Sequence, residues 1–582
     1  MRAWGWVVGL AVCMATLLLS GCGGESSSPP APPPSPAPSL TSLTPSGTYA
    51  GTGGFPLTVN GSGFVVSSTV QWNGSSRTTT FGSSSQLTAQ IPSSDLSAPV
   101  VASITVVNPS PGGASNALTF LVTPGPAPGT GVIQLVSVAT DGTPSNGNSF
   151  TPPAISADGR FVAFQSDATN LVPGPSSGLS DIYVRDACLG AAAGCTPTTT
   201  RVSVASDGSL ANANSRAPSI SGDGRFVAFD SSASNLVPND TNGPFAADVF
   251  VRDTCLGAPA GCTPSTTRVS VASDGTQANG DSRSASISAN GRFVAFGSGA
   301  TNLVVGDTNG AGDVFVRDTC AGAPTGCAPS TVLLSVATSG SQGNITSGAP
   351  AISADGRFVA FRSFATNLVP GDTNGQPDVF VRDTCAGAPA GCTTSTIRVS
   401  VATDGTQAND RDDLSPSISA QGRFVAFTSF ATNLVPGDTN GLADAFVRDT
   451  CAGAPAGCTP RTTRVSVVFD GTQANEGSGV PSISGDGRLV VFESLATNLI
   501  PGGTAAPKHV FLRDTCVGGP TGCIPTTILL SMTPDRFQGN GISDFQIISA
   551  DGHFVVFRSN STNLVPGGTN GNFQIFLART GF

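Results

Sequence analysis

The sequence predicts an all-β protein in which one four-stranded unit is repeated many times. Gly (72) and Pro (44) are abundant and only 11% of the residues are charged. Val, Thr, Ser and Phe fill the periodic segments, which is typical of strands and turns. The stretch ISADGRFVAF at 352–361 recurs in near-copies seven times between residues 155 and 557. Such strict recurrence at a fixed period indicates a repeat architecture.

The first 22 residues have the layout of an export signal. Arg2 is followed by an apolar run, and small residues precede Cys22. The segment LSGC at 19–22 resembles the lipobox of bacterial lipoproteins. This resemblance implies that residues 1–21 are removed and that Cys22 carries acyl chains, which anchor the protein to a membrane. The alternative is a plain secretory signal with cleavage at another position.

Residues 22–39 are rich in Pro, Ser and Gly and too poor in apolar residues to fold, which predicts an extended tether. Residues 40–123 contain short strand-like segments separated by Gly, Asn and Pro turns. The phrases NGSGF, VQWNG and VVNPSPGGASNALTF in this region resemble the IPT/TIG family. The resemblance implies an immunoglobulin-like sandwich over residues 40–123. We predict that Trp72 lies in its core, and a ligand-stacking Trp72 is the alternative.

A Pro/Gly-rich linker is expected at 124–131, and the repeats fill residues 132–582. The unit at 349–402 contains four strand-like pieces, APAIS, RFVAFRS, DVFVRDT and TIRVSVA. Asp355-Gly356 joins the first two as a hairpin turn. Four antiparallel strands per unit predict a blade of a β-propeller. The phrase S-x-D-G-R-F-V-A-F followed by D-V-F-V-R-D is similar to the repeat of TolB-like and WD-repeat-like propellers, which implies the fold and not a function.

The two ends of the repeat array predict the number of blades. Residues 132–142, VIQLVSVATDG, match the fourth strand of a unit, and the last unit stops after its third strand. One blade is therefore split between the two ends, and the N-terminal strand closes the ring. Seven units then predict a seven-bladed propeller. A six-bladed ring is the alternative, although it leaves one unit unplaced.

Each of the first six units contains a Cys-x6-Cys motif between its third and fourth strands. In an exported chain these pairs predict six local disulfides. The alternative is a metal site, which needs four converging thiolates or histidines, whereas successive pairs lie on different blades. The predicted pairs are Cys188–Cys195, Cys255–Cys262, Cys320–Cys327, Cys385–Cys392, Cys451–Cys458 and Cys516–Cys523.

Strand parity places the Asp-Gly turns and the Cys pairs on one face of the ring, and the loops after strands two and four on the other. This second face is rich in Asn, Asp, Thr and Gln. Asn367 has a counterpart in all seven units, which predicts a backbone-capping role and not ligand binding.

One motif on this face, D-x-N-G-x-x-D, resembles a short calcium loop. It occurs three times, at Asp307, Asn309 and Asp313, at Asp372, Asn374 and Asp378, and at Asp438, Asn440 and Asp444. Each copy supplies three side-chain oxygens, whereas calcium takes six to eight, so carbonyls and waters must complete the shell. The alternative is a polar Asn-Gly loop. Calcium is the one cofactor that the sequence suggests.

Charge and composition narrow the function. A net charge of −10 with Lys508 as the single lysine argues against nucleic acid as a partner. The two histidines are predicted on opposite faces, and no triad or nucleophile elbow is present. We therefore predict a monomeric, non-catalytic binding or scaffolding module for a protein or glycan ligand, lipid-anchored in the cell envelope, at the outer membrane or cell surface. The alternatives are a glycan hydrolase or lyase using channel carboxylates, and a TolB-like partner in envelope assembly.

Overall fold

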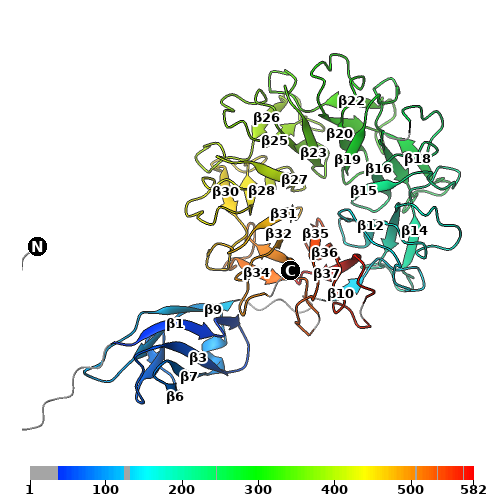
Figure 1. The fold of residues 1–582 in the computed structure, drawn as a ribbon. Coiled ribbons are helices and arrows are strands. Elements are labelled where there is room, and N and C mark those ends of the chain that lie inside the picture. Colours follow the sequence, from blue (N-terminus) through cyan, green and yellow to red (C-terminus); the bar gives the residue numbers. More distant parts are fainter. Residues whose placement is uncertain (1–36, 124–131, 244–245, 505–506, 534, 568) are drawn as a thin grey trace, which may run out of the picture.

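The computed structural model describes residues 37–123, 132–243, 246–504, 507–533, 535–567 and 569–582. The predicted signal, Cys22 and the linker at 124–131 lie outside these residues. The described part is all-β, as predicted, with a single short 3-10 helix at Ser93–Leu96. Its strands form an N-terminal body and a ring of repeated sheets (Figure 1). Within the described ranges, no helix has the length and apolar character needed to cross a membrane.

The N-terminal body consists of two packed sheets with strand orders β1-β3-β7-β6 and β2-β9-β8-β4-β5. Its strands are β1 (Ser39–Thr44), β2 (Gly47–Tyr49), β3 (Phe55–Ser62), β4 (Thr69–Trp72), β5 (Ser75–Ser76), β6 (Thr79–Ser83), β7 (Gln86–Ile91), β8 (Val100–Val107) and β9 (Leu118–Thr123). Trp72 is only 4% exposed, and its ring lies 5.1 Å from that of Phe120. Trp72 is therefore a core residue, and the ligand-stacking alternative is wrong.

The ring contains repeated four-stranded antiparallel sheets, each built from consecutive strands except one. The first strands are β11 (Ala154–Ile155), β15 (Ser215–Ile220), β19 (Ser282–Ile287), β23 (Ser347–Ile352), β27 (Asp412–Ile418), β31 (Ser478–Ile483) and β35 (Ser543–Ile548). The second strands are β12 (Phe161–Ser166), β16 (Phe226–Ser231), β20 (Phe293–Ser298), β24 (Phe358–Ser363), β28 (Phe424–Ser429), β32 (Leu489–Ser494) and β36 (Phe554–Ser559).

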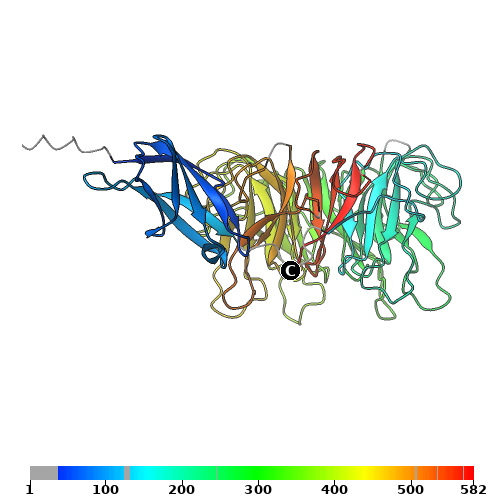
Figure 2. The same ribbon diagram turned by 90° about the horizontal axis from the view of Figure 1, so that it is seen from below.

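The third and fourth strands follow toward the outside of the ring. The third strands are β13 (Asp181–Asp186), β17 (Asp248–Asp253), β21 (Asp313–Asp318), β25 (Asp378–Asp383), β29 (Asp444–Asp449), β33 (His509–Asp514) and β37 (Gln574–Arg579). The fourth strands are β14 (Thr198–Arg201), β18 (Ser265–Arg268), β22 (Ser330–Leu333), β26 (Ser395–Arg398), β30 (Arg461–Arg464), β34 (Thr526–Leu529) and β10 (Ile133–Leu135). The side view shows that the strands run through the thickness of the ring and that long loops leave its faces (Figure 2).

The last sheet combines the two ends of the array, in the order β10-β37-β36-β35. β10 pairs antiparallel with β37, with Gln134 opposite Leu577. Just beyond β10, the Ser137 hydroxyl donates a buried hydrogen bond of 2.6 Å to Gln574. The first strand of each sheet lies against that of the next, and β11 lies against β35, so the first and last sheets meet.

A collar of seven small residues links the sheets where the Asp-Gly turns begin. In six of them the backbone N–H donates to the carbonyl of the equivalent residue in the next sheet, and Asp551 N–H donates to Ala157 to complete the circle, all at 2.9–3.0 Å. The collar consists of Ala157, Gly222, Ala289, Ala354, Ala420, Gly485 and Ala550. A Cβ on Gly222 would lie 3.1 Å from the Cβ of Ala289, so only Gly or Ala fits here.

The hydrophobic core lies between neighbouring sheets. The two Phe residues of RFVAF point to opposite faces of their strand, as alternation predicts. Phe358 packs against the following sheet, which contains β28, and Phe361 packs against the preceding one, which contains β20. Phe361 also stacks on Phe380 at a ring separation of 5.9 Å. Because every sheet buries both faces, no sheet can form its core alone.

The Asp-Gly turns are held by both backbone and packing. Gly356 has φ of +80°, which favours glycine, and Gly356 N–H donates to the Ser353 carbonyl. A Cβ on Gly356 would meet the ring of Phe293 in the preceding sheet at 2.2 Å. The glycine of the repeat is therefore required by conformation and by the close approach of the neighbouring sheet.

Candidate functional site

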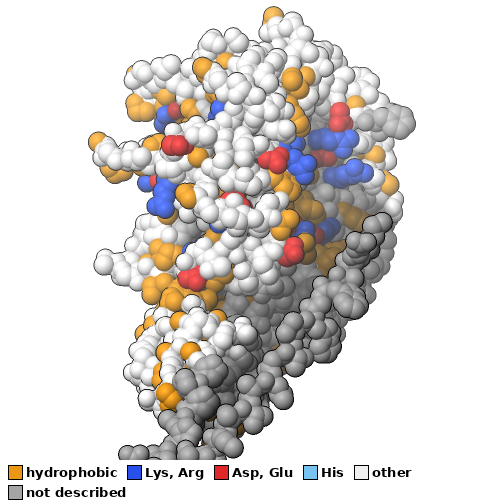
Figure 3. Space-filling model, turned by 60° about the vertical axis from the view of Figure 1, so that its left-hand side comes forward, with side chains coloured by type: hydrophobic (Ala, Val, Ile, Leu, Met, Phe, Trp, Pro, Cys, Tyr) orange, Lys and Arg blue, Asp and Glu red, His pale blue; other side chains and the backbone are white. Residues whose placement is uncertain are grey.

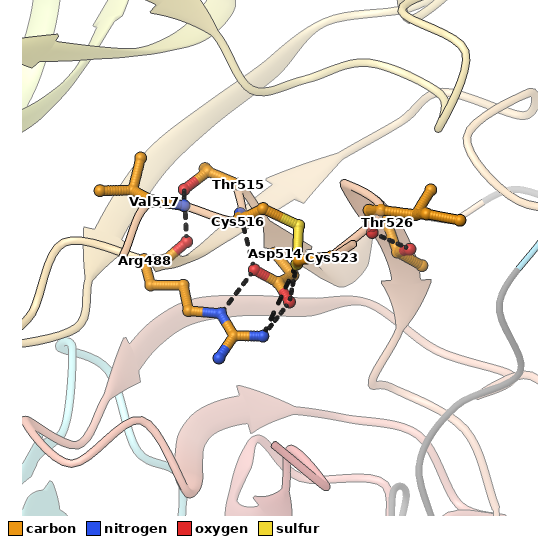
Figure 4. The surroundings of a disulfide bond; sticks show 8 residues. Arg488, Asp514, Thr515, Cys516, Val517, Cys523 and Thr526 are labelled. Carbon is orange, nitrogen blue, oxygen red and sulfur yellow. Dashed lines mark hydrogen bonds and ion pairs between the residues drawn. A yellow bond between two sulfur atoms is a disulfide. The ribbon is translucent and has the colours of Figure 1, made fainter. Parts of the chain in front are cut away.

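The Cys-x6-Cys motifs form the six predicted disulfides, so the metal alternative for these residues is wrong. Figure 4 shows one of them, Cys516–Cys523, beside an ion pair. Arg488 binds Asp514 at 2.6 Å, and Asp514 accepts the backbone N–H of Cys516 at 2.8 Å. The aspartate of V-R-D therefore pairs with the arginine of D-G-R across the sheet. This end is a structural anchor in the six sheets that carry a disulfide.

On the opposite face, Asn367 and its counterparts cap the backbone, as predicted. The Asn367 side-chain oxygen accepts the N–H of Asn344 at 3.0 Å, and its side-chain nitrogen donates to the Gln342 carbonyl at 2.8 Å. The same two bonds recur at Asn170, Asn235, Asn302, Asn433, Asn498 and Asn563. This recurring Asn is framework and not a ligand-binding residue.

The structure brings together the two aspartates of each predicted calcium motif. Arg398 lies 3.4 Å from Asp372 and 3.1 Å from Asp378. Gln407 donates to both carboxylates, at 2.9 and 3.3 Å. An arginine thus neutralises part of the charge that a calcium ion would balance. Asn374 turns its oxygen to the N–H of Gln376, away from the carboxylates, as in the polar-loop alternative.

The next copy of the motif has the same arrangement. Arg464 lies 3.4 Å from Asp438 and 3.2 Å from Asp444, and Asn440 accepts the N–H of Leu442. The copy at Asp307, Asn309 and Asp313 shares the glutamine, because Gln342 donates to both aspartates at 2.8 and 2.9 Å. It lacks the arginine, since Leu333 occupies that position of the fourth strand.

The inner loops on this same face are where the repeats differ most. The fifth residue of each second strand lies next to the first strand and near the centre of the ring, and it differs between neighbouring sheets. The seven residues at this position are Gln165, Asp230, Gly297, Arg362, Thr428, Glu493 and Arg558. Six residue types at these seven equivalent positions indicate that the fold does not require this position to be uniform.

Several of these variable residues have charged or aromatic partners. Lys508 binds Glu493 at 2.6 Å, and Arg558 binds Asp544 at 2.8 Å. Glu493 also accepts the N–H of Phe545 in the next sheet at 3.3 Å. Thr428 accepts the N–H of Val480 in the same way, at 3.0 Å. Some of the residues at this variable position, Glu493 and Thr428, therefore stabilise the contact between neighbouring sheets.

Three consecutive sheets carry large apolar side chains at the same position after the second strand, two of them under an arginine, and we call these residues the mouth cluster. It comprises Arg362, Phe364, Arg411, Phe430 and Leu495. Arg362 lies 4.6 Å above the ring of Phe364, and Arg411 lies 4.4 Å above that of Phe430. Phe364 is 40% exposed and Leu495 is 50% exposed. Figure 3 shows Lys and Arg side chains gathered in a hollow, with acidic and hydrophobic side chains beside them.

Asp230, at the variable position of β16, should make stability depend on pH. Burial raises the pKa of Asp230 to about 7, although Arg283 and Arg216 oppose this shift. The folded protein then holds a proton that the unfolded chain has lost, so the free energy of unfolding should fall as pH rises from about 4 to about 7. Asp230→Asn should weaken this slope in urea titrations over that range. An unchanged slope would show that Asp230 ionises normally.

Comparison with known proteins identifies the N-terminal body. Residues 38–122 match the IPT/TIG domain family. The predicted IPT/TIG region is thereby confirmed. In the structure, the guanidinium carbon of Arg536, which belongs to the repeated sheets, lies 5.8 Å from the centre of the aromatic side chain of Tyr49 in the IPT/TIG domain. No curated protein matches the chain.

Among solved structures, a putative TolB from Agrobacterium tumefaciens is similar, with 16% identity and a TM-score of 0.31 over 66% of this chain and 94% of that one. A putative phosphatase from Bacteroides thetaiotaomicron has 11% identity and a TM-score of 0.35, over 94% and 98% of the two chains. Prolyl oligopeptidase B from Galerina marginata has 11% identity and a TM-score of 0.36, over 80% and 55%.

Proposed function

We propose that this protein is an exported, lipid-anchored envelope protein whose ring is a seven-bladed β-propeller serving as a non-catalytic binding module. The blade number is supported by the split last sheet and by the seven-membered collar. Acylation of Cys22 and the tether at 22–39 would hold the IPT/TIG domain and the propeller at a membrane surface. Intact-mass measurement of the mature protein tests the anchor, since acyl chains on Cys22 are expected.

One observation carries the binding role. The second strands repeat RFVAF almost unchanged, and the residues that follow change from sheet to sheet and include partly exposed aromatic side chains. Framework positions repeat because every sheet needs them, whereas a ligand contact has no reason to repeat around a ring. Phe364 and Arg362 provide the aromatic and arginine contacts that are enriched at protein interfaces. We place the ligand, a protein or a glycan, on the mouth cluster.

The experiment is capture of envelope proteins and of an array of glycans by the purified protein, compared between the wild type and two variants. The double variant Arg362→Ala and Phe364→Ala should lose most of the binding, at least about tenfold, because it removes an arginine and the aromatic ring that it covers. The control Ile397→Ser changes a 44% exposed residue on an outer strand and should bind as the wild type does.

Retention of all binding by the double variant would place the ligand elsewhere on the protein. Release of shorter sugars from the glycan array by the wild type would contradict the non-catalytic proposal and favour a glycan hydrolase. Both variants should have the wild-type melting temperature, because both replace exposed or half-buried side chains on the surface.

A further inference from the structure

The first residue of each third strand and the last residue of each fourth strand follow a charge rule. Where the third strand begins with aspartate, the fourth strand usually ends with arginine, and the two side chains form an ion pair at 3.1–3.3 Å. The pairs are Asp181–Arg201, Asp248–Arg268, Asp378–Arg398 and Asp444–Arg464. Where the third strand begins with neutral Gln574 or with His509, the fourth strand ends with Leu135 or Leu529.

One sheet breaks this rule. β21 begins with Asp313, and β22 ends with Leu333, which faces Phe315 just as Arg398 faces Phe380. Asp307 lies beside Asp313, and the side-chain amide of Gln342 donates a hydrogen bond to each of the two carboxylates. This sheet therefore buries two carboxylates without the guanidinium that the neighbouring sheets provide.

The contacts of the two aspartates show where positive charge is missing. Asp313 is fully buried and Asp307 is 9% exposed. Asp307 Oδ2 has no hydrogen-bond partner among the described residues. Asp313 Oδ2 accepts two donors, from Asn309 and Gln342, whereas Asp248 Oδ2 accepts these two equivalents and an arginine as well. A buried carboxylate without a positive counter-charge is costly even when it accepts hydrogen bonds, and two side by side are more so.

The surroundings can admit and coordinate a small ion. A cleft of about 610 Å³ lies next to the two carboxylates, which are buried behind its wall. Its lining includes Gly306 and Thr308, the chain neighbours of Asp307, together with Leu333 and Gln342. In two neighbouring sheets the arginine also reaches a backbone carbonyl, that of Gly371 or Gly437. The equivalent carbonyl here belongs to Gly306. Two carboxylates and a carbonyl are hard oxygen donors, and calcium takes six to eight oxygens, so water from the adjacent cleft would have to complete the shell.

We infer that Asp307 and Asp313 bind one divalent cation of the calcium type, which takes the place that arginine occupies in the adjacent sheets. The inference is independent of the ligand of the mouth cluster. The inference predicts different behaviour for the three calcium-like motifs, because only the carboxylates of Asp307 and Asp313 lack an arginine that balances their charge. The motifs at Asp372 and Asp438 carry their own arginines and are expected to bind no ion.

Isothermal titration of the purified protein with calcium chloride tests this inference. We expect uptake of one Ca²⁺ per chain at millimolar ion or below, and a melting temperature that rises with Ca²⁺ and falls with EDTA. Leu333→Arg should abolish the uptake and make the melting temperature independent of EDTA. The variant should fold, because the same environment accommodates arginine in three neighbouring sheets.

A reciprocal variant makes the test specific. Arg398→Leu recreates the exceptional arrangement in the next sheet, with Asp372 and Asp378 left without arginine, and should raise the uptake to two Ca²⁺ per chain. Wild-type protein that takes up no Ca²⁺ or Mg²⁺ would overturn the inference, and the two carboxylates would then share a proton. Uptake that persists in Leu333→Arg would place the ion at another site and would overturn it equally.

Discussion

Phe380→Ala is expected to lower the free energy of unfolding by about 3 to 5 kcal/mol, the usual cost of removing a fully buried aromatic ring. Phe380 is 0% exposed and stacks on Phe361, which carries the contact to the preceding sheet. The cavity cannot collapse easily, because the backbones of both neighbouring sheets are held by the collar. Equilibrium unfolding in guanidinium chloride measures the change.

Phe364→Ala is the matched control, since it removes the same kind of ring from a 40% exposed position directly after the end of β24. Its effect on stability should stay within about 0.5 kcal/mol. Comparable losses in the two variants would mean that the stacked Phe pairs do not dominate the stability of the ring.

Deleting residues 132–142 should make the protein associate with further copies of itself. The deletion removes β10 and leaves the N–H and C=O groups of β37 exposed along a full edge, which is a template for pairing with another chain. It also uncovers the buried Ile575 and Leu577 and removes the Ser137 bond to Gln574. Size-exclusion chromatography with light scattering, together with the melting temperature, reports the change.

A rearranged chain provides the control. Residues 132–142 can be deleted at their natural place and appended after Phe582, because the Arg579 N–H already bonds the Val132 carbonyl at 3.2 Å. This chain has the same composition and should be a monomer with a melting temperature close to that of the wild type. If the rearranged chain also associates, or if the simple deletion does not associate, then the pairing of β10 with β37 is not what prevents self-association.

Features that repeat could be predicted from the sequence because each copy reports the same physical need. Alternating apolar residues predicted the strands, and Cys-x6-Cys predicted the disulfides. The collar was not predicted, although Ala or Gly precedes every Asp-Gly-type turn. Its cause is a hydrogen bond between sheets, as from Ala354 to Ala420, and the spacing within one unit contains no sign of that contact.

The candidate sites were less predictable, since they depend on which residues meet across strands. Asp372 and Asp378 were recognised as an oxygen-rich motif, but Arg398 lies 20 residues after Asp378 in a strand predicted only from its apolar residues. Leu333 has no polar group and does not suggest a site by itself. It becomes informative only because the equivalent residue in four other sheets is an arginine. A comparison of the repeats column by column would have shown both the charge rule and its exception.

The separation of β10 from β37 also has a consequence for the order in which the protein is made. Ser137 and Gln574, which bond across the closing sheet, are 437 positions apart. At the usual synthesis rate of about 5 to 20 residues per second, the N-terminal strand waits roughly 20 to 90 s for its partner. During that interval the nascent chain offers an unpaired strand at its beginning and an open sheet face at its growing end. Each of the six disulfides joins cysteines only seven positions apart, so none of them depends on the closure of the ring.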